Sequence, residues 1–201
     1  MTTAVAWTKD DPLGMEYAEV DLGSDRMRAA GVALGTDPVA YRLDYELETA
    51  AGFVTTALRL HARGDGWSRE LRLSRDRAGW TAEAGGRGAA PLDPLGGDLG
   101  PLAGAVDPDV EFSPLFNTMP VLRHRLHEAG GPEDFVMVWV SVPELGIHVS
   151  PQRYTFVRAG ADGGAVVRFE ATGEGEDFTA DVVFDPAGLV VDYPGIARRV
   201  R

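Results

Sequence analysis

The chain has 201 residues, no cysteine, and 31 acidic side chains against 19 lysines and arginines, which gives a formal net charge of −12. The lack of cysteine excludes disulfides, thiolate metal sites and cysteine nucleophiles, and it favours a reducing compartment, so we predict a cytoplasmic protein. The excess of acid argues against nucleic acid and anionic membranes as partners, because affinity for phosphate comes from many Lys and Arg contacts.

The length fits a single domain spanning residues 1–201. The first ten residues lack the basic and apolar regions of a signal peptide, and no apolar run approaches the length of a membrane helix. We therefore expect no insertion into a membrane.

A hydrophobic period of two dominates the first half of the chain and predicts short antiparallel strands. Tyr41–Glu48 alternates apolar and polar residues without a break. The predicted strands cover residues 15–22, 26–34, 41–48, 53–60, 67–73 and 80–84. A stretch rich in Gly and Pro follows at residues 85–105 and predicts a long loop across the fold.

The same strand pattern resumes in the second half. Residues 135–140 are almost continuously apolar, which predicts a strand covered on both faces. Further strands are predicted at residues 147–149, 154–157, 166–169, 178–184 and 189–193. Only residues 114–128 suggest a helix, and Pro120 argues against a long one.

About twelve strands make an all-β protein whose sheet is too wide for side chains alone to fill when it closes. The sequence offers no long apolar helix to occupy the interior. We therefore predict a cavity or cleft lined by apolar side chains, with Trp139 either in the core or in that lining.

Four motifs in the second half resemble the signature of the putative glycolipid-binding family of bacterial proteins. They are the Asp-x-Asp of Asp107 and Asp109 with Ser113-Pro114, then Asn117-Thr118-Met119-Pro120, then Gln152-x-Tyr154, and finally the tail from Asp185 to Tyr193-Pro194. The resemblance is clear from about residue 104 to residue 199. The chain departs from the family pattern at Ala105, where a cysteine is common, and at Leu122, the first position of a basic pair.

The resemblance implies a single curved antiparallel sheet that forms an incompletely closed β-barrel, similar to bacterial lipoprotein carriers, with an apolar cleft and minimal helix. It also implies a lipid or glycolipid as the ligand.

The alternating carboxylates of Asp107, Asp109 and Glu111 could in principle bind Ca²⁺. We favour a structural role, in which Asp107 and Asp109 accept hydrogen bonds from loop amides around Asn117. The spacing of His124 and His127 does not fit a zinc helix, and on a strand the two side chains would face opposite sides. We predict no metal and no cofactor.

Arg123 and Arg125 could lie at the mouth of the cleft beside Gln152 and Tyr154 and donate hydrogen bonds to a head group. They could equally be paired arginines on a wet β-face. The candidate ligand-binding residues are Asp107, Asp109, Asn117, Arg123, Arg125, Trp139, Gln152, Tyr154 and Tyr193.

The sequence contains no Gly-x-Ser-x-Gly elbow and no nucleophile paired with a base, so we identify no catalytic residue. We predict non-catalytic binding of an amphiphilic or glycolipid-like ligand. Two alternatives stay open: an enzyme that acts on a hydrophobic substrate through Asp107 or Asp109, and an interaction module with a filled interior. A raised carboxylate pKa in a pocket would favour the enzyme.

Overall fold

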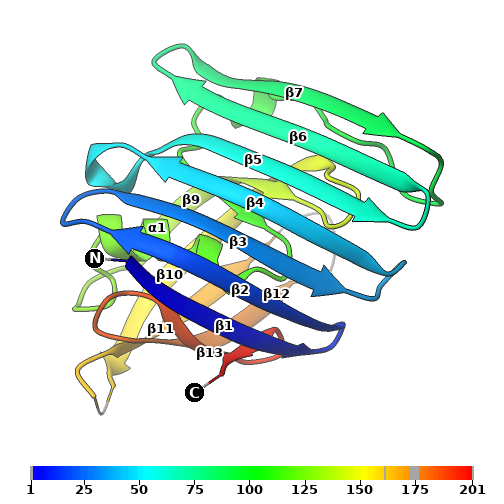
Figure 1. The fold of residues 1–201 in the computed structure, drawn as a ribbon. Helices are drawn as coiled ribbons and strands as arrows, with labels where there is room; N and C mark the ends of the chain where they lie inside the picture. Colours follow the sequence, from blue (N-terminus) through cyan, green and yellow to red (C-terminus); the bar gives the residue numbers. More distant parts are fainter. Residues whose placement is uncertain (1, 161, 173–176, 201) are drawn as a thin grey trace.

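The computed structural model describes residues 2–160, 162–172 and 177–200. In this part of the chain, fourteen strands form one sheet in the order β7-β6-β5-β4-β3-β2-β1-β14-β13-β12-β11-β10-β9-β8. The sheet curls so that β1–β7 form one wall and β9–β13 the other, with the short helix α1 between them (Figure 1). Hydrogen bonds between described residues do not close it. The predicted all-β, incompletely closed architecture is confirmed.

The first wall is a seven-stranded antiparallel meander. Its strands are β1 (Thr2–Asp10), β2 (Leu13–Leu22), β3 (Met27–Gly35), β4 (Tyr41–Thr49), β5 (Thr55–Gly64), β6 (Trp67–Asp76) and β7 (Gly79–Arg87). In β4 the residues from Tyr41 to Leu47 alternate as predicted, with every second side chain buried. Removing this apolar face from water stabilises the wall by about 25 cal/mol per Å².

The second wall continues the sheet from the other end of the chain. Its strands are β8 (Pro108–Val110), β9 (Glu133–Val140), β10 (Ile147–Ala159), β11 (Ala165–Ala171), β12 (Phe178–Phe184), β13 (Val190–Tyr193) and β14 (Ala197–Arg199). β14 pairs with β1, where Trp7 lies opposite Arg199. β1, β8 and β14 were not predicted, and the two strands predicted between residues 147 and 157 are one strand, β10.

The Gly- and Pro-rich stretch crosses the opening between β7 and the second wall. Trp80 donates a hydrogen bond from Nε1 to the carbonyl oxygen of Ala105 (2.9 Å), and Arg69 donates to the carbonyl oxygens of Asp93 (2.6 Å) and Glu144 (2.8 Å). The predicted loop is confirmed, but it begins later, because β7 runs to Arg87. Side chains of β6 and β7 thus hold the stretch in place.

The interior of the curled sheet is filled by residues 102–126, which we call the interior segment. It contains a 3-10 turn (Pro114–Asn117) and α1 (Thr118–Arg123); two further 3-10 turns span Ala51–Phe53 and Gly100–Leu102. Leu115, Phe116 and Met119 are fully buried in one cluster with the inner side chains of β4, β5 and β6. An irregular segment thus fills the space for which the sequence offered no long helix, so of the two possibilities left open the interior between the walls is the filled one.

β9 is covered on both faces in its second half, whereas Val136 in the predicted apolar run is 40% exposed. Val138 and Val140 belong to the core cluster that faces the first wall, whereas Phe135 packs against a second cluster around Tyr154 and Phe169. No helix in residues 2–160, 162–172 and 177–200 combines the length and the apolar character needed to cross a bilayer.

Candidate functional site

A cleft of about 400 Å³ opens on the second wall, and its lining divides into a polar side and an apolar side. Its polar residues come from β8, the interior segment and β10, and its apolar residues come mostly from β11, β12 and the turn before β14. The polar lining consists of Asp109, Glu111, Ser113, Asn117, Ser150, Gln152 and the hydroxyl-bearing Tyr193. The apolar lining consists of Val110, Phe112, Trp139, Phe169, Ala171, Phe178 and Ile196.

Gln152 and Asp109 form the centre of the polar side. Gln152 donates from Nε2 to Oδ2 of Asp109 (2.6 Å) and to Oγ of Ser150 (3.2 Å), and its Oε1 accepts a hydrogen bond from the Tyr154 hydroxyl (3.3 Å). The β8–β9 register sets Asp109 opposite Trp139. One oxygen of Asp109 is thus held by protein, and the chain of donors fixes the orientation of the Gln152 amide.

Two carboxyl groups of the cleft have raised pKa values. Burial raises the pKa of Asp109 to about 6, and the hydrogen bond from Gln152 only partly offsets this. Burial also raises the pKa of Glu111 to about 7. The hydrogen bond from the Val142 amide (2.8 Å) lowers this pKa, and the negative charge of Glu144 raises it further. Both side chains are therefore deprived of the water or cations that an ionised carboxylate prefers.

Asn117 adds an unsatisfied acceptor. Its side chain is 2% exposed, and its Oδ1 has no hydrogen-bond partner among the described residues. Buried amide oxygens are rarely left without a donor, and each such case calls for an explanation. In the cleft, the missing donor can come from a ligand.

Ser113 links the cleft to a buried ion pair in the first wall. Its Oγ donates to Oε1 of Glu16 (2.6 Å), which also accepts from the Tyr45 hydroxyl (2.8 Å). Lys9 Nζ lies 3.3 Å from the other oxygen of Glu16. Because the hydroxyl hydrogen of Ser113 is donated to Glu16, the Ser113 oxygen can still accept a hydrogen bond.

Aromatic rings form the apolar side. Phe169, Phe178 and Tyr193 contact one another, with ring centroids 5.9–6.1 Å apart. Gln152, Ala171 and Phe178 lie opposite one another across β10, β11 and β12, so their side chains share one face of the sheet. Phe169 is two positions before Ala171 on β11 and therefore points to the same face. Such a triad offers flat apolar surface to an alkyl chain or to the C–H face of a sugar ring.

Five of the nine predicted ligand-binding residues line this cleft: Asp109, Asn117, Trp139, Gln152 and Tyr193. Tyr154 lies directly behind, fully buried, and acts on the cleft through Gln152. The structure thus brings together residues that are up to 84 positions apart in the chain, because the sheet curls and the 3-10 turn Pro114–Asn117 contacts both β8 and β13.

Asp107 and the two arginines lie elsewhere. Asp107 is fully buried, is paired with Arg123, and accepts from Thr55 Oγ1 (3.0 Å). Both residues line a separate pocket of about 230 Å³. Arg125 is exposed and pairs with Glu128. Neither arginine lines the cleft beside Gln152, so of the two alternatives for these arginines the placement at the mouth is not the one observed.

Two further expectations are corrected. Asp107 and Asp109 bond to the side chains of Thr55, Arg123 and Gln152, not to loop amides around Asn117. His124 and His127 follow α1 in turns, not on a strand. Within the described part of the chain, no three His, Cys, Asp or Glu side chains gather as metal ligands.

Among the lining residues that the sequence did not identify are Glu111 and Ser113, to which other roles were assigned, and the two rings of Phe169 and Phe178. The period-two pattern of residues 166–169 and 178–184 carried the signal for the two rings. What it lacked was the identity of the sheet face that meets the interior segment.

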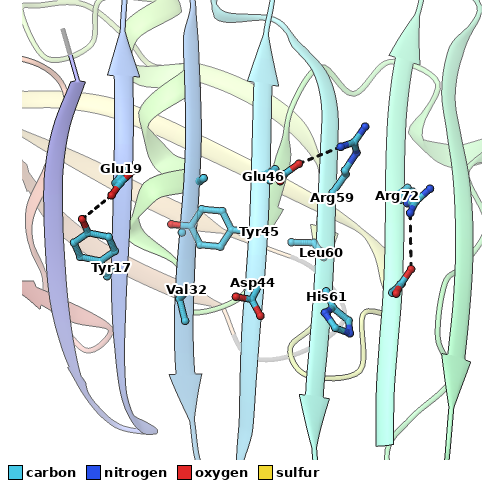
Figure 2. A pocket seen from close by; sticks show the side chains of 13 residues that line it. Tyr17, Glu19, Val32, Asp44, Tyr45, Glu46, Arg59, Leu60, His61 and Arg72 are labelled. Atoms are coloured by element: carbon cyan, nitrogen blue, oxygen red, sulfur yellow. Dashed lines mark hydrogen bonds and ion pairs between the residues drawn. The ribbon is translucent and has the colours of Figure 1, made fainter.

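A second hollow, of about 490 Å³, lies on the outer face of the first wall, across β2–β6 (Figure 2). Its charged groups are already satisfied by neighbours: Arg59 pairs with Glu46 (3.1 Å), and the Tyr17 hydroxyl donates to Glu19 (3.0 Å). Because its charges are paired and it has no buried unsatisfied group among the described residues, we place the candidate site in the cleft.

Comparison with known proteins agrees with the sequence motifs. A family model described as "Putative glycolipid-binding" matches residues 4–199. A crystal structure of a DUF1089 family protein from Pseudomonas aeruginosa has a similar fold, with a TM-score of 0.66, 26% sequence identity and coverage of 92% of each chain. No curated protein matches the sequence. The chain belongs to the family described as putative glycolipid-binding.

Proposed function

We propose that the protein binds an amphiphile of the glycolipid type without transforming it, and that the cleft holds the polar head. The observation that carries this proposal is the division of the cleft into an acceptor-rich side around Asp109 and Gln152 and an aromatic side around Phe169 and Phe178. A ligand with a hydroxylated head and an apolar tail matches both sides. The volume of the cleft, about 400 Å³, lies within the range of small-molecule sites.

The filled interior limits how much alkyl chain the protein can take up. Since residues 102–126 occupy the space between the walls, the tail has only the aromatic side of the cleft to cover. Each buried methylene contributes about 0.8 kcal/mol. Affinity should therefore rise over the first few methylenes and then level off.

Isothermal titration with alkyl glucosides of increasing chain length, each kept below its micelle concentration, tests this proposal. Ala171→Trp would fill the cleft between Gln152 and Phe178 and should abolish binding. Ala57→Trp, on β5 of the opposite wall, is the matched control and should leave binding unchanged. Equal affinity for all chain lengths, or full binding by Ala171→Trp, would remove the support for the cleft as a lipid site.

A second candidate function is acid–base catalysis on a hydrophobic substrate in the same cleft. The raised pKa values of Asp109 and Glu111, about 6 and about 7, favour it, because groups that titrate near neutral pH can both donate and accept protons. Of the two aspartates first considered, only Asp109 is available, since Asp107 is paired with Arg123. Mass spectrometry of each glucoside after long incubation with the protein distinguishes the two functions: recovery unchanged supports binding, and loss that Asp109→Asn abolishes supports catalysis.

A further inference from the structure

The cleft offers acceptors in excess and no cation. Asp109, Glu111 and Asn117 line it, the Oδ1 of Asn117 has no hydrogen-bond partner among the described residues, and none of the described lining residues is a lysine, arginine or histidine. A ligand that enters the cleft therefore meets two carboxyl groups and a residue whose amide oxygen lacks a hydrogen-bond donor. An anionic head group would add a third negative charge in a poorly hydrated space.

The nearest cationic groups do not relieve this imbalance. Lys9 is committed to Glu16, behind Ser113, and Arg123 is committed to Asp107 in the neighbouring pocket. His148 lies against Trp139, with ring centroids 5.2 Å apart, and is directed at the indole. The protein therefore supplies Asp109 with one amide donor, from Gln152, and with no ion pair among the described residues.

The unpaired Asn117 oxygen is an independent sign of a donor-bearing ligand. It is buried on the interior segment, whereas Asp109 belongs to β8 and Gln152 to β10, so the three groups converge from different elements. A hydroxyl satisfies one acceptor, but an ammonium group has three donors and a positive charge. Its donors and its charge match a cleft that is lined both by a carboxylate and by a residue with an unpaired amide oxygen.

We infer that the cleft selects amphiphiles whose head group carries a protonated amine, such as an amino sugar, over neutral ones, and that it rejects anionic ones. This inference rests on the proposed function and specifies its ligand class. A charge-assisted hydrogen bond to a desolvated carboxylate is stronger than a neutral one, whereas a phosphate or carboxylate head would face repulsion from Asp109 and Glu111.

Three octyl glycosides with the same tail test this directly: octyl 2-amino-2-deoxyglucoside, octyl glucoside and octyl glucuronide, titrated calorimetrically into the whole protein near pH 7.5. We expect the amine to bind about tenfold more tightly than the neutral sugar and the glucuronide to bind more weakly than either. Asp109→Asn should remove the preference for the amine, measured as the ratio of the dissociation constants of octyl 2-amino-2-deoxyglucoside and octyl glucoside, because an asparagine can still accept from Gln152 but carries no charge.

Asp134→Asn is the control for general attraction by an acidic protein, because it removes the same charge from an exposed position on β9 that does not line the cleft. It should keep the preference for the amine. Equal binding of the three glycosides, tighter binding of the glucuronide, or an amine preference that survives Asp109→Asn would overturn the inference while leaving the cleft as a lipid site. No binding of any of the three would overturn the proposed function, and this inference with it.

Discussion

Ser113 donates a 2.6 Å hydrogen bond to Glu16, and this contact joins the interior segment to the first wall across 97 positions of sequence. Glu16 is 1% exposed and faces Lys9, which is 4% exposed. The ion pair is thus buried between the two walls, next to the polar side of the cleft. Buried pairs of this kind cost much when one partner is removed, because the other charge is left without compensation.

We expect Glu16→Ala to lower the free energy of unfolding by about 3–5 kcal/mol, because Lys9 would be left buried and unpaired. Urea denaturation measures this. Glu19→Ala is the matched control, since Glu19 lies on the same strand, is exposed, and accepts a hydrogen bond from the exposed Tyr17. It should change stability by about 0.5 kcal/mol or less. Similar losses in the two variants would contradict the buried pair.

Arg123 and Arg125 should differ sharply although they stand two positions apart. Arg123→Ala leaves the buried Asp107 carboxylate without its cation, and we expect a loss of about 3 kcal/mol in stability. Arg125→Ala removes an exposed pair with Glu128 and should cost about 0.5 kcal/mol or less. Neither should weaken binding of octyl glucoside at a temperature where both variants are folded. A binding loss confined to Arg125→Ala would restore the basic pair as a head-group site.

Asp109 should make the protein less stable as the pH rises through mildly acidic values. Its pKa is raised from 3.8 to about 6 in the folded protein, so the folded state binds the proton more tightly than the unfolded chain. Its contribution therefore decreases between about pH 4 and pH 6 and is fully lost above that, by up to about 3 kcal/mol. Glu111, with a pKa raised to about 7, extends the same trend upward.

Urea denaturation of Asp109→Asn between pH 4 and about pH 6 should give a flatter stability curve than the wild type. Asp134→Asn serves as the control: Arg153 lowers the pKa of Asp134, so that this group titrates below the window. Parallel curves for the wild type and Asp109→Asn would mean that Asp109 is not desolvated.

Trp139 should report on binding by its fluorescence. It lines the cleft, whereas Trp7, Trp67 and Trp80 are buried in the core of the first wall. Octyl glucoside should therefore change the emission spectrum of the wild type, and Trp139→Phe should abolish the change. In Trp67→Phe the change should persist. A response that depends on Trp67 would place the ligand elsewhere.

The alternation of residues such as Tyr41–Glu48 made the sheet predictable, because a period of two fixes which side chains share a face. The motifs located Asp109, Asn117, Gln152 and Tyr193, which do meet. Alternation cannot show where an irregular segment packs: nothing local in residues 102–126 shows that they fill the interior of the curled sheet.

The same limit explains the misplaced arginines. Arg123 and Arg125 alternate like strand residues, but α1 and the turn after it send one side chain to Asp107 and the other to solvent. The partner of Arg123 is Asp107, 16 residues earlier in the chain, and the two meet because the interior segment brings the residue before β8 back to α1. Long-range packing decided this placement.

Mapping of amide chemical shifts by NMR during titration with octyl glucoside tests the central claim most directly, because it locates the ligand on the molecule. If the ligand binds in the cleft, as we propose, the shifts will concentrate at Asp109, Asn117, Gln152, Ala171 and Phe178. Shifts centred instead on Tyr17, Glu46 and Arg59, in the outer hollow of Figure 2, would contradict the cleft as the binding site.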